Sequence, residues 1–290
     1  MRRLELGVGL AWAGLAVAGL GLGYDPVRDV DFSLGRSLPS LEHPLGTDRA
    51  GRDLLARLVD AAPRFLAPGA LGAGVAAVLG VLLGAPLGWR DPIERGRGPK
   101  SGRLRRAGEA MVDGLLGVPG AVPPYVVLLL VGVGFGFDPL AIGLVAGGLA
   151  AAELAEALAD RIRREREAEY VVSARAEGLS ARTVLFRHLV WFQSRGLVAR
   201  SALAVFPRVL LVEAALSCLP PGGFGVKEPT PSWGNMLVEP MQALVGGAAR
   251  GAPSWALAWN ALVPVAAVMG AVSSFAWLGG RLSRQAESAG

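Results

Sequence analysis

The sequence predicts an all-α, polytopic membrane protein with about six transmembrane helices. Its 290 residues are 52% hydrophobic and 18% charged, which is too apolar for an ordinary soluble domain. The apolar residues gather into runs close to the ~20 residues that a spanning helix needs. Lysine and arginine are abundant in alternate connecting segments, as the positive-inside rule requires of a multi-pass protein.

The first apolar run covers residues 4–22 and follows Arg2 and Arg3. It is long for the core of a signal peptide, and Gly-Tyr-Asp-Pro follows it instead of a small-x-small cleavage site. We interpret the run as a retained transmembrane helix, with a cleaved signal as the alternative. Residues 1–64 are then an N-terminal helix with an external segment.

The five remaining runs belong to a predicted transmembrane domain at residues 65–290. They cover residues 65–89, 112–135, 140–158, 197–219 and 255–278. In the fourth run, Glu153 and Glu156 lie in the last third. The backbone polar groups of every run must pair within a helix, because lipid offers no partners.

The basic residues predict the orientation. Residues 90–106 and 161–195 hold most of them, and with six helices both segments lie on the side of the two termini. Residues 24–64 balance acids and bases, and residues 220–254 have only Lys227 and Arg250 as bases. Both termini are therefore expected in the cytoplasm. Segment 90–106 is expected to hold this topology and to contact anionic lipid, and its "GRGPKS" lacks the Gly-Lys pair of a phosphate loop.

The residue types needed for catalysis or metal binding are scarce. Cys218 is the single cysteine, so the chain cannot form a disulfide within itself. His43 and His188 are the two histidines, and neither has a partner at ligand spacing. No nucleophile, base and orienting group occur in a recognisable arrangement. We expect no catalytic residue, no metal site, no bound cofactor and no nucleic-acid partner.

A charged segment rich in small residues, "EYVVSARAEGLSARTVLFRHLV", occupies positions 169–190. Residues 170–176 are good helix formers, Gly178 is a helix stop, and Ser180 is an N-cap for a second helix at 181–190. Ser173, Ala174 and Ala176, together with Gly178, allow another protein's backbone to approach closely. The alternative is an amphipathic helix lying on the membrane surface.

This segment resembles the cytoplasmic coupling loop, or EAA loop, of ABC importer permeases of the dipeptide and oligopeptide type. The matching residues are Glu169, Tyr170, Val171, Ala174, Arg175, Ala176, Gly178, Ser180, Arg187 and His188. "HPLGTDRAGRDLLARLV" at 43–59 is similar to that family's segment before the second helix. Residues 213–237 are similar to its fifth-helix exit and external loop. The three ordered blocks resemble the second permease subunit of such an importer, with a type I importer permease fold.

The resemblance implies an importer of peptides or of a similar small solute, such as nickel, in a bacterial inner membrane. Its partners would be a second homologous permease, two cytoplasmic ABC ATPases and an extracytoplasmic substrate-binding protein. The coupling loop would dock on an ATPase, and closure of the two ATPases on ATP would move it together with the membrane helices. ATP would be used by the partners.

Departures from the family pattern leave an alternative open. Trp191 replaces the proline that usually follows the loop, Val172 and Ser173 replace Glu-Ala, and Glu177 occupies a usually hydrophobic position. The alternative is a non-transporting scaffold or regulatory subunit derived from a permease.

Two charged residues, Arg208 and Glu213, lie within the fifth run. A charge near the bilayer centre costs at least ~2.5–3.5 kcal/mol, so both side chains are expected to face protein or water. They either line the translocation path or form a structural interhelix pair.

The external loop before the sixth run is marked by Pro229, Pro231, Trp233 and Asn235. It is either a compact plug packed by Trp233 or a contact for a substrate-binding protein, and the two roles are compatible.

Overall fold

The computed structural model describes residues 2–21, 23–89, 123–135, 138–219, 225–245 and 254–287. Within these ranges the regular structure is helical, apart from one isolated β-bridge between Thr47 and Asp53. The prediction of an all-α, polytopic membrane protein is confirmed. Five helical stretches are long and apolar enough to cross a membrane: Leu4–Gly21, Leu54–Trp89, Pro139–Glu165, Arg195–Cys218 and Trp255–Gln285.

The third predicted run is described only in its second half. Its described part is the 12-residue apolar helix α5, Pro124–Phe135, which is shorter than a span. Residues 112–122 lie outside the described residues, as does the basic segment 90–106 with its "GRGPKS" stretch. The sixth span therefore stays a prediction.

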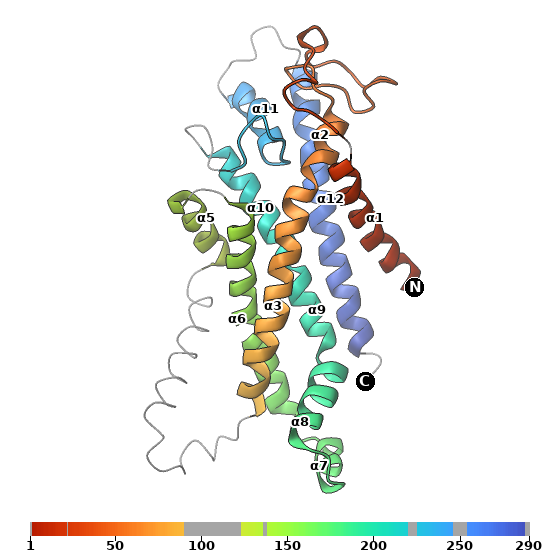
Figure 1. Cartoon of the computed structure of the whole chain (residues 1–290), viewed down its shortest axis with the longest axis vertical. Helices are drawn as coiled ribbons and strands as arrows, with labels where there is room; N and C mark the ends of the chain where they lie inside the picture. Colours follow the sequence, from red (N-terminus) through yellow and green to blue (C-terminus); the bar gives the residue numbers. More distant parts are fainter. Residues whose placement is uncertain are drawn as a thin grey trace. The chain divides into compact units, whose positions relative to one another are not determined.

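Figure 1 shows the helices in chain order. Besides α5, they are α1 (Arg2–Gly21), η1 (Phe32–Leu34), α2 (Leu54–Ala61), α3 (Pro63–Trp89), α6 (Pro139–Glu165), α7 (Glu169–Ala176), α8 (Ala181–Thr183), η3 (Val184–Gln193), α9 (Arg195–Leu203), α10 (Val205–Cys218), α11 (Asn235–Val245) and α12 (Ser254–Glu287).

Two predicted spans differ from the structure, because a short helix precedes the second and the fifth is divided. The second begins at Leu54 rather than Phe65, because Asp53 caps α2 by accepting a 2.7 Å hydrogen bond from the Ala56 N–H. Pro63 then opens α3, where its missing N–H does no harm. The fifth span divides between α9 and α10, and Pro207 lies in the first turn of α10, where proline is tolerated.

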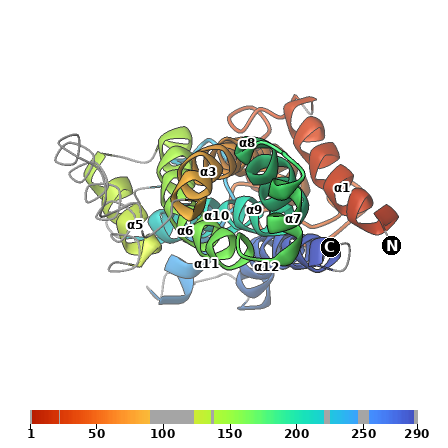
Figure 2. The same ribbon diagram turned by 90° about the horizontal axis from the view of Figure 1, so that it is seen from below.

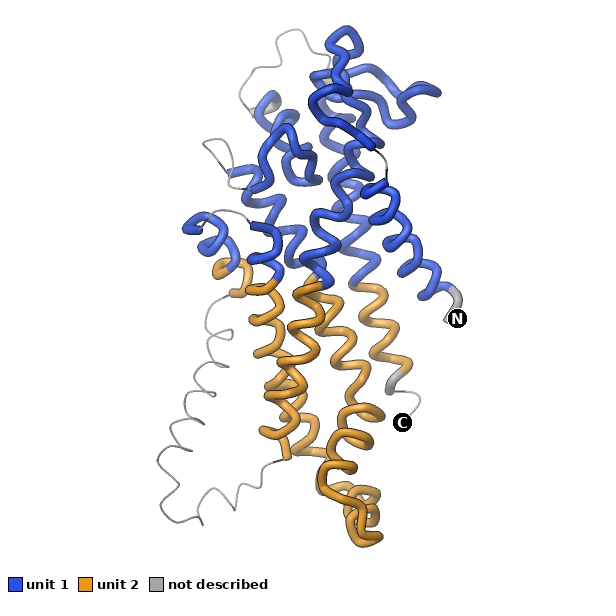
Figure 3. Tube along the Cα trace, in the orientation of Figure 1, with its two compact units in different colours: residues 1–70, 128–143, 206–275 blue, residues 71–127, 144–205, 276–290 orange. Residues whose placement is uncertain are grey.

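The chain forms two compact units (Figure 3). Unit 1 comprises Met1–Ala70, Leu128–Gly143 and Phe206–Phe275, and unit 2 comprises Leu71–Val127, Leu144–Val205 and Ala276–Gly290. The sequence-based boundary at residue 64 separates the N-terminal segment from the transmembrane domain by predicted membrane topology, not by packing, and it stays a prediction.

Unit 1 contains a cluster of aromatic rings from four helices and a loop. The ring of Trp12 in α1 stacks on Phe275 of α12 with a centroid distance of 5.5 Å, and its Nε1–H donates to the Ser274 hydroxyl at 2.8 Å. Phe65 of α3 lies 4.6 Å from Trp233, and Phe206 of α10 stacks on Phe275 at 4.4 Å. These contacts pack α1 against the other helices of the unit.

In unit 2, α3 and α6 pack closely through small residues spaced by four. A Cβ on Gly80 would lie 2.6 Å from a Leu154 methyl, and one on Gly84 would lie 2.6 Å from the Ala155 carbonyl oxygen. A Cβ on Gly88 would lie 2.7 Å from the Ala159 carbonyl oxygen. Small residues at this spacing let helix backbones approach in membranes, where the hydrophobic effect gives helices little reason to associate.

Candidate functional site: an exposed helical turn and an anchored loop

The segment at 169–193 forms a helix, a turn and a second helix in unit 2. It lies at the lower end of that unit in Figure 1 and faces the viewer in Figure 2. The chain reverses at Gly178, whose φ of +88° is a left-handed conformation that glycine adopts without strain. The Ser180 side chain then accepts a 3.2 Å hydrogen bond from the Thr183 N–H. The predicted stop and N-cap are both present.

The second helix differs from the prediction in two ways. It is α-helical only over Ala181–Thr183, and it continues to Gln193 with a π-helical hydrogen-bond pattern instead of ending at Val190. The helix of the fourth predicted run, residues 140–158, continues further, because α6 ends at Glu165.

One side chain fixes α7 to the body of unit 2. Val171 is fully buried in a cluster that includes Leu158 and Ile162 of α6 and Leu189 of the following helix. Ala174 is half-buried against the same cluster. A displacement of α7 is therefore opposed by a packed contact with a long helix.

The remaining predicted coupling residues are exposed. They are Glu169, Tyr170, Arg175, Ala176, Gly178 and Ser180. A Cβ placed on Gly178 would meet nothing within 4 Å, so the turn faces open space in this chain. The exposed face of α7 and the turn therefore presents small side chains flanked by charged ones, while the buried Val171 packs the opposite face against α6.

Two contacts hold the border of this surface. The Tyr170 hydroxyl donates to Glu165 at 3.1 Å, and partial burial, with the charge of Glu165 adding to it, raises the pKa of Tyr170 to about 12. The guanidinium of Arg175 lies 5.8 Å from the ring centre of Trp89, a cation–π distance. Arg187 and His188 lie further along, on the π-helical stretch.

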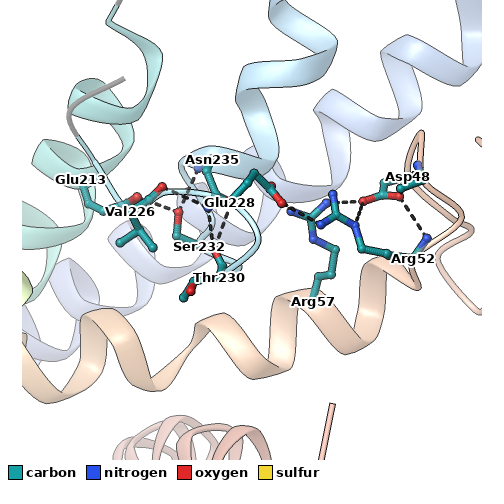
Figure 4. A network of polar contacts seen from close by, with 10 residues as sticks. Asp48, Arg52, Arg57, Glu213, Val226, Glu228, Thr230, Ser232 and Asn235 are labelled. Carbon is teal, nitrogen blue, oxygen red and sulfur yellow. Dashed lines mark hydrogen bonds and ion pairs between the residues drawn. The ribbon is translucent and has the colours of Figure 1, made fainter. Parts of the chain in front are cut away.

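In unit 1, Glu213 holds the loop at residues 225–234 (Figure 4). Its carboxylate accepts hydrogen bonds from the hydroxyls of Ser217 at 2.8 Å and Ser232 at 2.7 Å, and from the Gly234 N–H at 3.1 Å. Glu213 is 5% exposed. The carboxylate is thus surrounded by donors from its own helix and from residues 232–234, and its place in a translocation path or in an interhelix pair stays a prediction.

The loop itself is compact. The Nε1–H of Trp233, which is buried, donates to the Leu58 carbonyl at 2.9 Å. The Asn235 amide donates to the carbonyls of Val226 and Thr230, and its oxygen accepts from the Ser232 N–H. Pro231 is buried, and Pro229 follows Glu228 through a cis peptide bond. These contacts agree with a plug packed by Trp233.

An ion network that the sequence analysis missed connects this loop to the segment before α2 (Figure 4). Asp48 accepts from Arg52 Nε at 2.7 Å and from Arg57 Nη1. Both arginines also donate to Glu228, Arg52 at 2.7 Å and Arg57 at 2.5 Å. The sequence feature that could have indicated the network is "DRAGRD" at 48–53, where two acids flank two arginines. Its partner, Glu228, lies far away in the sequence, so residue spacing could not identify it.

The network stabilises the contact between residues 48–57 and the loop that holds Glu228. Arg57 is 3% exposed and Asp48 is 5% exposed, so each charge depends on its partner. Loss of one partner of a buried pair costs about 3–5 kcal/mol. The His43 ring adds a 2.8 Å contact to Asp53, the N-cap of α2.

Arg208 is half-buried in α10, five residues before Glu213. Its role in the translocation path stays a prediction. Among the described residues, no three His, Cys, Asp or Glu side chains are grouped so that they could hold a metal ion.

These features define a class of protein: a multi-pass, all-helical membrane protein with an exposed, rigidly held helical turn and an anchored loop. Over 222 residues, 75% of its length, the chain is 32% identical to a Brucella suis protein that is named among peptide permeases. The chain matches 66% of that relative's own length.

Two further relatives are named as transport system permeases. The Haemophilus influenzae oligopeptide permease OppC is 29% identical over 213 residues, 72% of this chain and 62% of OppC. The Alkalihalophilus pseudofirmus dipeptide permease DppC is 26% identical over 245 residues, 83% of this chain and 70% of DppC. No protein-family model matches. The chain belongs to the permeases of ABC peptide and dipeptide importers.

Proposed function

We propose that the chain forms half of a translocation path through a bacterial inner membrane and works with a second, homologous permease. The observation that carries this proposal is the exposed turn with Gly178 and Ser180, which follows α7, a helix that the buried Val171 packs against α6. A small-residue surface on a short helix suits insertion into a groove of another protein. Because α7 is packed against α6, a movement of α7 would be transmitted to this long helix.

ATP hydrolysis belongs to separate subunits in this proposal. Two cytoplasmic ATPases bind ATP and grip the turn of each permease, and this chain contributes no cofactor of its own. The Lys/Arg bias supports cytoplasmic termini and a cytoplasmic turn. The anchored loop at 225–235 then lies outside, where an extracytoplasmic binding protein delivers the solute.

The substrate class is peptides. It is supported by relatives named for peptides, oligopeptides and dipeptides, and a further relative from Pectobacterium atrosepticum is named a glutathione permease. Glutathione is itself a small peptide with free carboxylates, so peptide chemistry is common to these names.

A deletion strain tests the proposal. Uptake of radiolabelled dialanine, trialanine, hexa-alanine and glutathione is compared in the wild type, in the strain lacking this chain, and in the complemented strain. We expect the deletion to abolish the ATP-dependent part of the uptake of at least one peptide, and the wild-type chain to restore it. Equal uptake of every peptide in all three strains would favour the non-transporting scaffold and contradict the proposal.

A further inference from the structure

A cavity of about 640 Å³ opens within unit 1, beside the ion network of Figure 4. Its wall comes from the segment before α2, from α2 itself, from the loop before α11, and from α11 and α12. Leu54, Met236 and Val238 supply apolar surface. The volume lies within the range of about 300–1,000 Å³ that is usual for small-molecule sites.

The acidic groups of the wall already have cations. Asp48 and Glu228 are each bound by Arg52 and Arg57, and Glu239 is bound by Arg36. These three acids and three arginines neutralise one another.

One further cation lines the cavity. Arg49 is exposed, and the part of the chain that the structure describes gives it no ion pair. Arg36, which pairs with Glu239, lies outside the wall; when it is counted with the wall residues, the charge of Arg49 stays unbalanced and favours an anionic group on a ligand.

The wall also contains hydrogen-bond donors without acceptors. Asn260 of α12 is 4% exposed, and its buried Nδ2 has no hydrogen-bond partner among the described residues. The Nε of Arg57, a residue that is 3% exposed, is in the same condition. A buried donor without an acceptor costs about 1–3 kcal/mol, so its acceptor is commonly supplied by a ligand or by water.

We infer that this cavity binds a small ligand with a carboxylate, of the size of a di- or tripeptide. The carboxylate accepts from the amide of Asn260 and lies near the charge of Arg49. The terminal torsion of asparagine is broad, so a rotation of the amide turns Nδ2 toward the cavity. Leu54, Met236 and Val238 contact the apolar part of the ligand.

The inference rests on the proposed function, because it places a peptide-binding site in a peptide permease. It adds a site on unit 1 that meets the peptide through its C-terminus and in which the acids of the wall are already paired. A free amino terminus is not needed for binding.

The test uses the full chain in lipid nanodiscs, without ATPases, and equilibrium dialysis with radiolabelled trialanine as the probe. We expect saturable binding, competition by N-acetyl-trialanine, and about tenfold weaker competition by trialanine amide, which lacks the carboxylate. Asn260→Leu and Arg49→Gln should each weaken trialanine binding about tenfold. Arg28→Gln is the matched control, because Arg28 is an exposed arginine of the same unit outside the cavity wall.

Arg49 is exposed, so its variant reports on binding even if Asn260→Leu alters folding. No saturable binding at millimolar trialanine, equal competition by acid and amide, or an Arg49→Gln variant that binds like Arg28→Gln would each overturn the inference. If binding fails while the deletion strain still loses peptide uptake, only this inference is lost. Binding without any uptake defect would contradict the proposed function instead.

Discussion

Substitution of Glu213 by alanine should release the loop at residues 225–234. The change removes the acceptor of three buried donors: the hydroxyls of Ser217 and Ser232 and the N–H of Gly234. Each unsatisfied buried donor costs about 1–3 kcal/mol, and hydroxyls can turn toward other acceptors, so the lower limit applies. Three donors at about 1 kcal/mol each give about 3 kcal/mol, which corresponds to about 100-fold more frequent opening of the loop.

Hydrogen exchange of the chain in nanodiscs measures this opening at residues 225–245. We expect about 100-fold faster exchange in Glu213→Ala. Glu213→Gln should give a smaller increase, because an amide keeps one acceptor oxygen but meets at least one donor with its own NH₂. Glu177→Ala, which removes an exposed acid, is the control. Exchange in Glu213→Ala within about threefold of this control would refute the idea that Glu213 holds the loop.

Three further predictions concern the loop, the topology and the turn. Gly234→Ala should also loosen the loop, because its Cβ would lie 2.5 Å from Glu213 Oε2; wild-type exchange at 225–245 would contradict this. In a cysteine-free chain, membrane-impermeant maleimide should label exposed Glu42→Cys from outside and exposed Glu177→Cys from the cytoplasm, and the reverse pattern would invert the topology. Burial and Glu165 favour the neutral phenol of Tyr170, so the stabilisation it provides should be complete below pH ~10 and lost as pH rises through about 12. An alkaline absorbance titration of wild type and Tyr170→Phe measures this. The prediction is wrong if the substitution removes a phenol that ionises near pH ~10.

Hydrophobic runs and local caps predicted much of the fold because they depend on neighbouring residues. The positions of the helices, the left-handed Gly178 and the Ser180 cap all follow from short stretches. The helix α2 that precedes the second predicted span was missed because its apolar run is amphipathic and short.

The long-range polar contacts could not be predicted from one sequence. Arg57 meets Glu228 across 171 positions, and the Trp233 indole meets the Leu58 carbonyl across 175. Spacing along the chain carries no information on such pairs. The sequence did indicate that Glu213 faces protein or water, since a charge in an apolar helix is costly, but not which donors surround it.

The turn also shows which substitution isolates docking. Any L-residue at Gly178 meets the strain of a φ of +88°, so a bulky residue there would disturb the turn as well as its surface. Ala176 is exposed and ends α7 in a helical conformation, so Ala176→Trp adds bulk without backbone strain. Ala176→Ser is the matched control, because it keeps the side chain small.

The central claim is that separate ATPases drive peptide transport by docking on α7 and on the turn that follows it. The direct measurement is ATP-dependent accumulation of radiolabelled peptide in proteoliposomes that contain this chain, its partner permease, the two ATPases and the binding protein. Wild type and Ala176→Ser should accumulate the peptide, and Ala176→Trp should lower accumulation about tenfold or more, since a bulky ring prevents close approach of the ATPase. Accumulation by an assembled Ala176→Trp complex at the rate of Ala176→Ser would contradict the claim.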